Sequence, residues 1–307
     1  MSAPKTLWLG TALWGWGVDE PTANAIIDRY VGAGGVRVDT AMNYPINGQE
    51  KDFGRANSIL GNWLKRNPGA GLEVFCKIGA LDNSGGAKVN LRRSSILTTV
   101  ELLRAKFGDQ LWGIGVHWDN RSSQKEIGQT VEAMAALHAE GFAIGLSGVS
   151  RPDLYAKCLP QLASEWWMQV KENAATCKAR RSYTPHFPTA RYIAYGINMG
   201  GVKMTDAARP DSSLAMRGLS EPAITSRLRA FLAETRPIAP APRTLNDLAL
   251  LIAFLEPDLS AAIVGPRSPR QLEESLSYWS QLGDLRIDEP ARSAIAQLLV
   301  ERNAEER

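Results

Sequence analysis

The stretch Val36-Arg37-Val38-Asp39-Thr40-Ala41-Met42-Asn43-Tyr44 shows how this chain is organised. A short strand begins at Val36 and ends in the carboxylate of Asp39, and the phenol of Tyr44 follows in a loop. An acidic residue at a strand end, with a phenol at loop distance, is how a parallel barrel presents proton chemistry at the C-terminal ends of its strands. Taken alone, the two residues equally fit a turn cap and a core tyrosine.

The composition is that of an ordinary globular protein. The chain has 307 residues, of which 44% are hydrophobic and 22% charged, and its formal net charge of +3 is too small to indicate a nucleic acid or an anionic membrane as partner. The sequence contains neither an apolar run of signal-peptide length at its start nor an apolar stretch of membrane-span length.

Cysteine and histidine usage point to a reducing compartment and to a site without metal. The three cysteines are an odd number without metal-ligand spacing, and three histidines are too few for a His-rich metal site. We therefore expect a soluble, cytoplasmic protein. The residues concerned are Cys76, Cys158, Cys177, His117, His138 and His186.

Strand-like and helix-like segments alternate along most of the chain. Strands are expected at residues 7–9, 36–39, 72–78, 111–116, 142–146, 166–170, 192–195 and 261–264. Helices are expected at residues 20–31, 52–66, 90–107, 122–139, 152–159, 221–235, 245–255, 269–281 and 289–302. The pattern weakens at 175–190, and a long polar loop runs to about residue 220.

Eight strand-and-helix units without a break in composition predict one (β/α)8 TIM barrel domain over residues 1–307. The alternative is a doubly wound open sheet. Against it, the first strand is followed by Gly10-Thr-Ala-Leu-Trp-Gly-Trp-Gly, which is not the G-x-G-x-x-G fingerprint of a dinucleotide-binding fold.

Two further strands bring ionisable groups to the same face as Asp39. Lys77 lies within the apolar run Val-Phe-Cys-Lys-Ile, and His117 follows the strand at 111–116. Each could simply be a residue at the barrel rim. A buried lysine needs a partner, however, and Asp39 on the neighbouring strand is the expected one.

These four groups suit the reduction of a carbonyl group. A phenol has an ordinary pKa of about 10, and we expect the ammonium of Lys77 to lower the pKa of Tyr44. Asp39 would keep Lys77 charged, and His117 would hydrogen-bond a substrate oxygen. Because no redox group is present among them, a cofactor must supply the hydride.

At these positions the sequence resembles the aldo-keto reductase superfamily. Asp39, Tyr44, Lys77 and His117 match its Asp–Tyr–Lys–His tetrad, within Val-Asp-Thr-Ala-Met-Asn-Tyr, Phe-Cys-Lys-Ile and Val-His-Trp. The resemblance implies a (β/α)8 barrel that uses a nicotinamide cofactor, with Tyr44 as the general acid.

The resemblance also implies a set of cofactor contacts. Ser147 and Gln169 would contact the nicotinamide carboxamide, and Tyr195 would stack on the nicotinamide ring. In the loop after the eighth strand, which begins at Gly265, Arg267 and Ser268 would face the ribose phosphate, as a basic and hydroxyl pair at a helix start can. The adenine end would contact Gln271, Glu274 and Ser275. The same positions also fit a capped helix start.

The sequence departs from the family at two cofactor positions, where Gly148 and Ser275 stand in place of the usual asparagines. The loops at 45–51, 81–88 and 176–191 also differ from those of well-known reductases, so the substrate does not follow from the resemblance.

The sequence thus predicts an NAD(P)H-dependent enzyme that reduces an aldehyde or ketone to an alcohol, and Arg267 favours NADP(H) over NAD(H). Trp16 and Trp118 are expected at the substrate pocket. The polar runs Asp119-Asn120-Arg121 and Lys171-Glu172 favour a polar, sugar-derived carbonyl substrate, although they equally fit solvated loops.

Two alternatives remain at this stage. One is a catalytically idle protein of the same fold that binds the cofactor as a sensor or subunit. The other is a lyase barrel in which Lys77 forms a Schiff base with the substrate.

Overall fold

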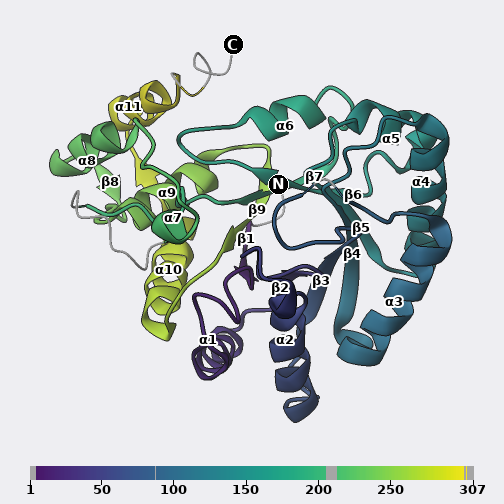
Figure 1. The fold of residues 1–307 in the computed structure, drawn as a ribbon. Coiled ribbons are helices and arrows are strands. Elements are labelled where there is room, and N and C mark those ends of the chain that lie inside the picture. Colours follow the sequence, from purple (N-terminus) through teal and green to yellow (C-terminus); the bar gives the residue numbers. More distant parts are fainter. Residues whose placement is uncertain (1–4, 87, 205–212, 301, 303–307) are drawn as a thin grey trace.

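The computed structural model describes residues 5–86, 88–204, 213–300 and 302. Eight parallel strands close into a barrel in the order β1-β2-β3-β4-β5-β6-β7-β9, with helices around them (Figure 1), which confirms the (β/α)8 prediction. The barrel strands are β1 (Thr6–Gly10), β2 (Arg37–Ala41), β3 (Glu73–Ile78), β4 (Leu111–His117), β5 (Ala143–Ser147), β6 (Trp166–Lys171), β7 (Arg191–Tyr195) and β9 (Leu259–Val264).

The helices follow the strands, and those after β7 gather on one side of the barrel (Figure 1). They are α1 (Glu20–Gly32), α2 (Arg55–Arg66), α3 (Arg93–Phe107), α4 (Gln124–Ala139), α5 (Pro152–Cys158), α6 (Lys178–Tyr183), α7 (Ser213–Met216), α8 (Thr225–Ala233), α9 (Leu245–Leu255), α10 (Pro269–Gln281) and α11 (Glu289–Val300). None of the helices in the described ranges combines the length and the apolar character that a membrane span requires.

Several details differ from the sequence-based expectation, among them the start of the helix expected at 221–235, which is observed at Thr225. The helix expected at 52–66 begins at Arg55, because Gly54 has a φ of 74° and the preceding residues form a short 3₁₀ turn. The weakly patterned segment at 175–190 contains α6. The segment between the helices expected at 221–235 and 245–255 contains β8 (Ile238–Ala239), which pairs with β10 (Arg286–Ile287). Residues 205–212 of the long loop and residue 301 of the expected last helix lie outside the described residues.

Side chains alternate between two apolar cores. The outward residues of the strands pack against the helices, and the inward residues form a second cluster inside the barrel that includes Trp8, Phe75 and Ile193. On β2, Arg37 and Asp39 share the inward face, and on β3 Phe75 and Lys77 do so, because strand side chains alternate with a period of two. On β3 the apolar residue Phe75 therefore lies one inward position before Lys77.

Glycines on two adjacent strands make room for Phe75 in the barrel interior. A Cβ atom added at Gly113, Gly115 or Gly145 would lie 2.4, 2.7 or 2.6 Å from ring atoms of Phe75. The Gly145 Cβ would also lie 2.5 Å from the carbonyl oxygen of Trp167 on β6. Since a backbone atom of a closed barrel has little room to move, this position is the most restrictive of the three.

We therefore expect Gly145→Ala to lower the free energy of unfolding by about 1–3 kcal/mol, the usual cost of overpacking. Urea denaturation would measure the loss. The matched control is Gly32→Ala at the end of α1, where an added Cβ would have no neighbour within 4 Å and should leave stability unchanged or slightly raised. An equal effect at both positions would contradict the packing argument.

Candidate active site

The barrel brings the four tetrad residues together at the C-terminal ends of its strands. Asp39 comes from β2, Lys77 from β3 and His117 from the last position of β4, while Tyr44 lies in the loop after β2. All four side chains are buried. Buried ionisable groups that converge from consecutive strands distinguish this end of the barrel from an ordinary rim.

Asp39 is the centre of the hydrogen-bond network. Its two carboxylate oxygens accept hydrogen bonds from Lys77 Nζ at 2.5 and 2.6 Å, and Oδ1 also accepts one from Gln169 Nε2 at 2.7 Å. The side-chain exposure of Lys77 and Asp39 is 2% and 5%. Lys77 is therefore held as an ammonium by an ion pair that water does not reach, as expected from the sequence.

Tyr44 lies over this pair. Lys77 Nζ is 5.1 Å from the centroid of the Tyr44 ring. Burial raises the pKa of Tyr44 well above its ordinary value, and the negative charge of Asp39 raises it further, whereas Arg217 opposes the rise. The net lowering of the Tyr44 pKa that we expected from Lys77 is not found, because burial and the charge of Asp39 dominate. Tyr44 is thus a phenol that keeps its proton at neutral pH.

His117 is a neutral imidazole held between two rings. Burial lowers its pKa well below the ordinary value, and the charge of Lys77 lowers it further. The Trp118 ring stacks on it at a centroid distance of 4.3 Å, and Tyr44 meets it edge-on at 5.9 Å. Its Nδ1 lies 3.1 Å from Asn43 Oδ1. Asn43 is not recognisable as a site residue from the sequence, because nothing local distinguishes it from a loop residue.

The structure explains why position 148, one of the departures from the family pattern, is a glycine. Its φ is 66°, and an added Cβ would lie 2.8 Å from Cδ1 of the Trp118 ring. A side chain at position 148 would therefore push Trp118 away from His117. The glycine leaves room for the tryptophan that forms the cavity wall.

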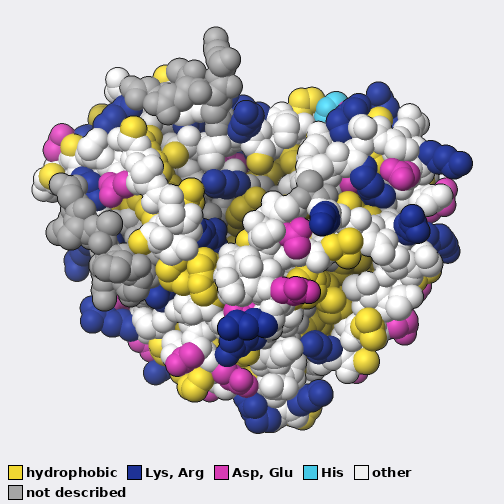
Figure 2. Space-filling view, viewed as in Figure 1, with side chains coloured by type: hydrophobic (Ala, Val, Ile, Leu, Met, Phe, Trp, Pro, Cys, Tyr) yellow, Lys and Arg dark blue, Asp and Glu magenta, His cyan; other side chains and the backbone are white. Residues whose placement is uncertain are grey.

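A cavity of ≈ 1670 Å³ extends from the tetrad to the loop after β9. Figure 2 shows the surface hollowed between the segments that carry α7 to α10 and the rest of the barrel, with Lys and Arg side chains around the hollow. Its lining includes Asp39, Tyr44, His117, Trp118, Ser147, Gln169, Tyr195, Gly265, Arg267, Gln271, Glu274 and Ser275. Nearly all of the predicted site residues thus face one space.

The far end of the cavity is lined by charged side chains of both signs. Arg243, Arg267 and Arg270 line it, and so do Asp247, Glu273 and Glu274. Arg243 was missed because it stands in an unremarkable turn before α9. Arg267 donates to Gly17 O at 3.4 Å and Arg270 pairs with Glu274 at 2.8 Å. A guanidinium in such a position can bind an anion such as a phosphate.

Ser268 does not line the cavity. Its hydroxyl accepts a hydrogen bond from the backbone N–H of Gln271 at 3.3 Å and so caps α10. The Gln271 side chain in turn accepts from the backbone N–H of Arg267 at 2.9 Å. The capped helix start considered from the sequence is therefore present, and it fixes the loop that carries Arg267.

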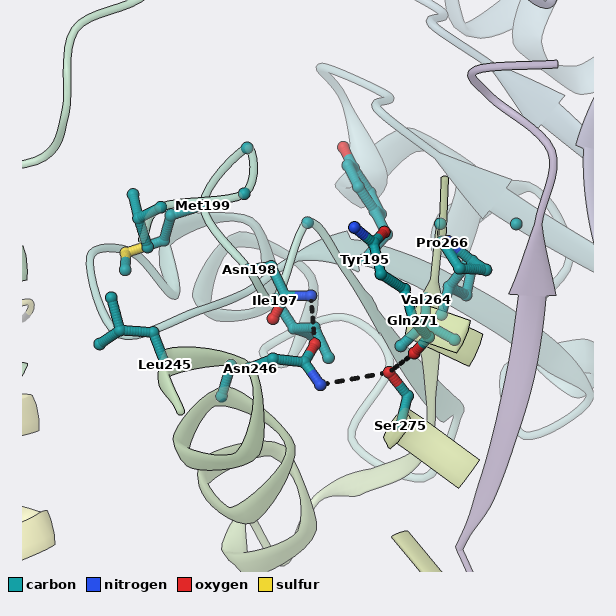
Figure 3. A pocket seen from close by; sticks show the side chains of 18 of the residues that line it. Tyr195, Ile197, Asn198, Met199, Leu245, Asn246, Val264, Pro266, Gln271 and Ser275 are labelled. Atoms are coloured by element: carbon teal, nitrogen blue, oxygen red, sulfur yellow. Dashed lines mark hydrogen bonds between the residues drawn. The ribbon is translucent and has the colours of Figure 1, made fainter. Parts of the chain in front are cut away.

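Ser275, the second departure, is joined to an asparagine of another helix. Asn246 of α9 donates to Ser275 Oγ at 3.2 Å and accepts from Asn198 Nδ2 at 2.7 Å, and Ser275 donates to Gln271 O at 2.9 Å (Figure 3). An amide thus lies beside position 275 even though that residue is not an asparagine. Sequence reasoning missed Asn246, because its helix approaches α10 only in the folded barrel.

Other predicted substrate-site residues serve the scaffold. Trp16 packs against the core and does not line the cavity. Asp119 is buried and binds Arg121 and Tyr155, at 2.8 and 2.6 Å. Glu172 is buried and accepts from Arg180 at 2.8 Å. These charges are structural ion pairs, so they give no support to a polar substrate.

Comparison with known proteins places the chain among the reductases. The model of the aldo/keto reductase family matches residues 6–292. Among solved structures, the aldo-keto reductase AKR11C1 from Bacillus halodurans (holo form) is similar, with a TM-score of 0.69 and 18% identity over 95% of this chain and 91% of that chain. No match was found among curated protein sequences.

The burial of neutral His117 should make stability depend on pH. Below the ordinary histidine pKa of about 6.5 the unfolded chain binds a proton that the folded site does not bind. The free energy of unfolding is therefore independent of His117 titration above that pH and decreases as the pH falls below it.

We expect the wild type to lose at most about 1.4 kcal/mol per pH unit relative to His117→Gln, as measured by urea denaturation between about pH 5 and 8. His138→Gln, at the end of α4, should follow the wild type; a parallel pH profile for all three proteins would contradict this.

Proposed function

The chain belongs to the aldo/keto reductase family of oxidoreductases, and we propose that it reduces an aldehyde or ketone to an alcohol with a nicotinamide cofactor and with Tyr44 as the proton donor. The observation that carries the proposal is the buried Asp39–Lys77 ion pair beneath a protonated tyrosine. At a barrel end without a functional site, an ammonium and a carboxylate would remain exposed to solvent, because burying both is costly.

Each group has a defined part in this reaction. As negative charge develops on the carbonyl oxygen, the hydroxyl proton of Tyr44 passes to that oxygen. The charge of Lys77 then stabilises the phenolate left behind, and Asp39, which in turn accepts a hydrogen bond from Gln169, holds the ammonium in place. Trp118 and His117 form the wall against which the substrate lies.

The cavity fits a nicotinamide dinucleotide. It runs from the tetrad to the arginines at its far end, and the amide oxygen of Gln169 is available to a carboxamide because its nitrogen is bound to Asp39. Ser147 and Tyr195 line the same end. When bound, the cofactor supplies the hydride that the chain itself lacks.

The arginines support NADPH as the preferred form. A ribose phosphate at the far end would meet Arg267, with Arg243 and Arg270 on the same wall. Gln271, Glu274, Ser275 and the neighbouring Asn246 would then line the adenine subsite, while Ser268 acts through the helix cap.

The cysteines support a reducing compartment such as the cytoplasm. Cys76, Cys158 and Cys177 form no disulfide with one another, and burial raises the pKa of Cys76 to about 12. A thiol with so high a pKa is inert at neutral pH and has no part in catalysis.

The geometry disfavours both alternatives. A Schiff base requires a neutral amine, and the two oxygens of Asp39 hold Lys77 as an ammonium. An idle cofactor sensor has no need of a buried proton donor above a buried ion pair. Trapping of a substrate on Lys77 by borohydride would support the lyase.

Tyr44→Phe tests the proton donor. Loss of the hydroxyl should lower kcat for carbonyl reduction by about 10²–10⁴-fold, the usual contribution of general acid catalysis, while NADPH binding is unchanged. Nicotinamide absorbance with a panel of aldehydes and ketones measures the first, and cofactor fluorescence measures the second.

The matched control is Tyr192→Phe, which removes a buried tyrosine hydroxyl that donates to Phe187 O away from the cavity. Its activity per folded molecule should equal that of the wild type. Full activity of Tyr44→Phe would refute the mechanism, and a wild type that binds NADPH but reduces no carbonyl would favour the sensor.

Arg267→Ala tests the preference for NADPH. Loss of a charge-assisted contact to the phosphate should weaken NADPH about tenfold to a hundredfold more than NADH, as measured by titration of both cofactors. Arg29→Ala is the control. It removes a guanidinium of α1 that pairs with Glu273 on α10, the helix that follows Arg267, and it should change neither affinity. Equal losses for the two cofactors in Arg267→Ala would remove the argument.

A further inference from the structure

A cluster of buried charges lies behind the wall of the cavity. Arg302, which follows α11, is 6% exposed, and its guanidinium lies 3.6 Å from Glu172 after β6 and 2.8 Å from Glu256 after α9. Arg180 of α6 pairs with the same two glutamates. Burying four charges in one place is costly, and the proposed reaction uses none of them.

Arg302 also holds the backbone of the loop after β6. Its Nη1 donates to the backbone carbonyl oxygen of Asn173 at 3.3 Å. The Asn173 side chain is buried, and its Oδ1 accepts from the backbone N–H groups of Ala175 and Thr176 at 2.9 and 3.1 Å. Its Nδ2 donates to Gly196 O at 2.9 Å. Since a carbonyl oxygen only accepts, these bonds leave the amide one orientation.

Two consecutive residues of this loop thus hold the end of β7. Asn173 holds the carbonyl oxygen of Gly196, and the backbone N–H of Glu172 donates to the carbonyl oxygen of Tyr195 at 3.2 Å. Both Tyr195 and Gly196 line the cavity. Arg302 contacts Glu172 and Asn173 together, so its guanidinium fixes the two residues on which this part of the wall depends.

We propose that Arg302 is a positioning residue for the nicotinamide: by holding Glu172 and Asn173 it fixes Tyr195 and Gly196, and so it determines how tightly the reactive end of the cofactor is bound. The inference rests on the proposed function, in which the Tyr195 ring stacks on the nicotinamide. Arg302 itself lies outside the lining of the main cavity and acts through the loop after β6.

Amide hydrogen exchange tests the proposed contacts without any ligand. Arg302→Met removes the guanidinium and keeps an unbranched side chain. We expect it to speed exchange of the Glu172 amide, which donates to Tyr195 O, at least about tenfold, because local opening no longer breaks the contacts of Arg302. The Trp118 amide makes the equivalent bond between β4 and β5, to Ser147 O, and should keep its rate. Unchanged exchange at Glu172 would overturn the proposal.

Two ligands separate the ends of the cofactor. NADPH carries the nicotinamide, whereas adenosine 2′,5′-bisphosphate contains only the adenosine and phosphate end, which the capped loop of Arg267, Ser268 and Gln271 would bind. Arg302→Met should weaken NADPH by about threefold to thirtyfold, the range for a residue that acts through others. The affinity for the bisphosphate should stay unchanged. Fluorescence titration and competition measure the two affinities.

Asn173→Ala tests the next contact and leaves both ion pairs of Arg302 in place. It removes the bond to Gly196 O and should also weaken NADPH selectively, so it keeps the proposal testable if Arg302→Met does not fold. In the double variant the loss should be smaller than the product of the two single losses, because both residues act through the same contacts. Fully multiplicative losses would contradict this.

Arg104→Met is the matched control. Its guanidinium also pairs with two glutamates, Glu101 and Glu140, at 2.8 and 2.5 Å, but it lies on the outer helix α3. This variant should change neither the exchange of the Glu172 amide nor the affinity for either ligand. Equal effects of Arg104→Met and Arg302→Met would overturn the proposal.

The failures of the two proposals are distinguishable. If the wild type binds NADPH but Arg302→Met weakens both ligands equally, or neither, the proposed function stands and this inference fails. If the wild type does not bind NADPH, the proposed function fails and the role toward the nicotinamide fails with it. Amide exchange still decides in that case whether Arg302 holds the end of β7.

Discussion

The ion pair between Asp39 and Lys77 is the constraint on which the site depends. Two opposite charges lie inside a closed barrel, and removal of either one would leave an uncompensated buried charge at a cost of about 3–5 kcal/mol. The carboxylate also binds Gln169 from across the barrel. The pair, together with Gln169, therefore links β2, β3 and β6 near Tyr44. The side chains that hold these strands together are also those that take part in the proposed reaction.

The departures from the family pattern are local exchanges. Gly148 stands where an asparagine is usual, and the space it leaves is taken by Trp118, which covers one face of His117. Ser275 is shorter than the usual asparagine, and Asn246 from α9 places an amide beside its hydroxyl. At position 275 a neighbouring helix thus provides the amide that the serine lacks, whereas at position 148 an indole ring takes the place of a side chain.

The loops after β2 and β3 show how variable segments reach the chemistry. They contain no tetrad residue besides Tyr44, yet their hydrogen bonds position the carbonyl oxygen of Asp82, which orients Asn43. Through the amide of Asn43, these loops contact Nδ1 of His117. Loop residues can thus reach a strand-end side chain while the strand-end residues stay the same.

The sequence by itself was sufficient for the barrel and for the meeting of Asp39, Lys77 and His117. Strand alternation has a period of two, and parallel strands present their C-terminal ends at one face, so residues at strand ends meet wherever the loops run. The direction of the Tyr44 pKa shift was wrongly predicted, because it depends on the burial of the phenol and on its distance from the charge of Asp39.

Only the tertiary structure decided which loop residues reach the cavity. Trp16 packs into the core and the charges of Asp119 and Glu172 are used in ion pairs. Asn43 and Asn246 face the site through contacts with residues distant in the chain. Such contacts follow from the packing of loops and helices against one another, which no local pattern of residues encodes.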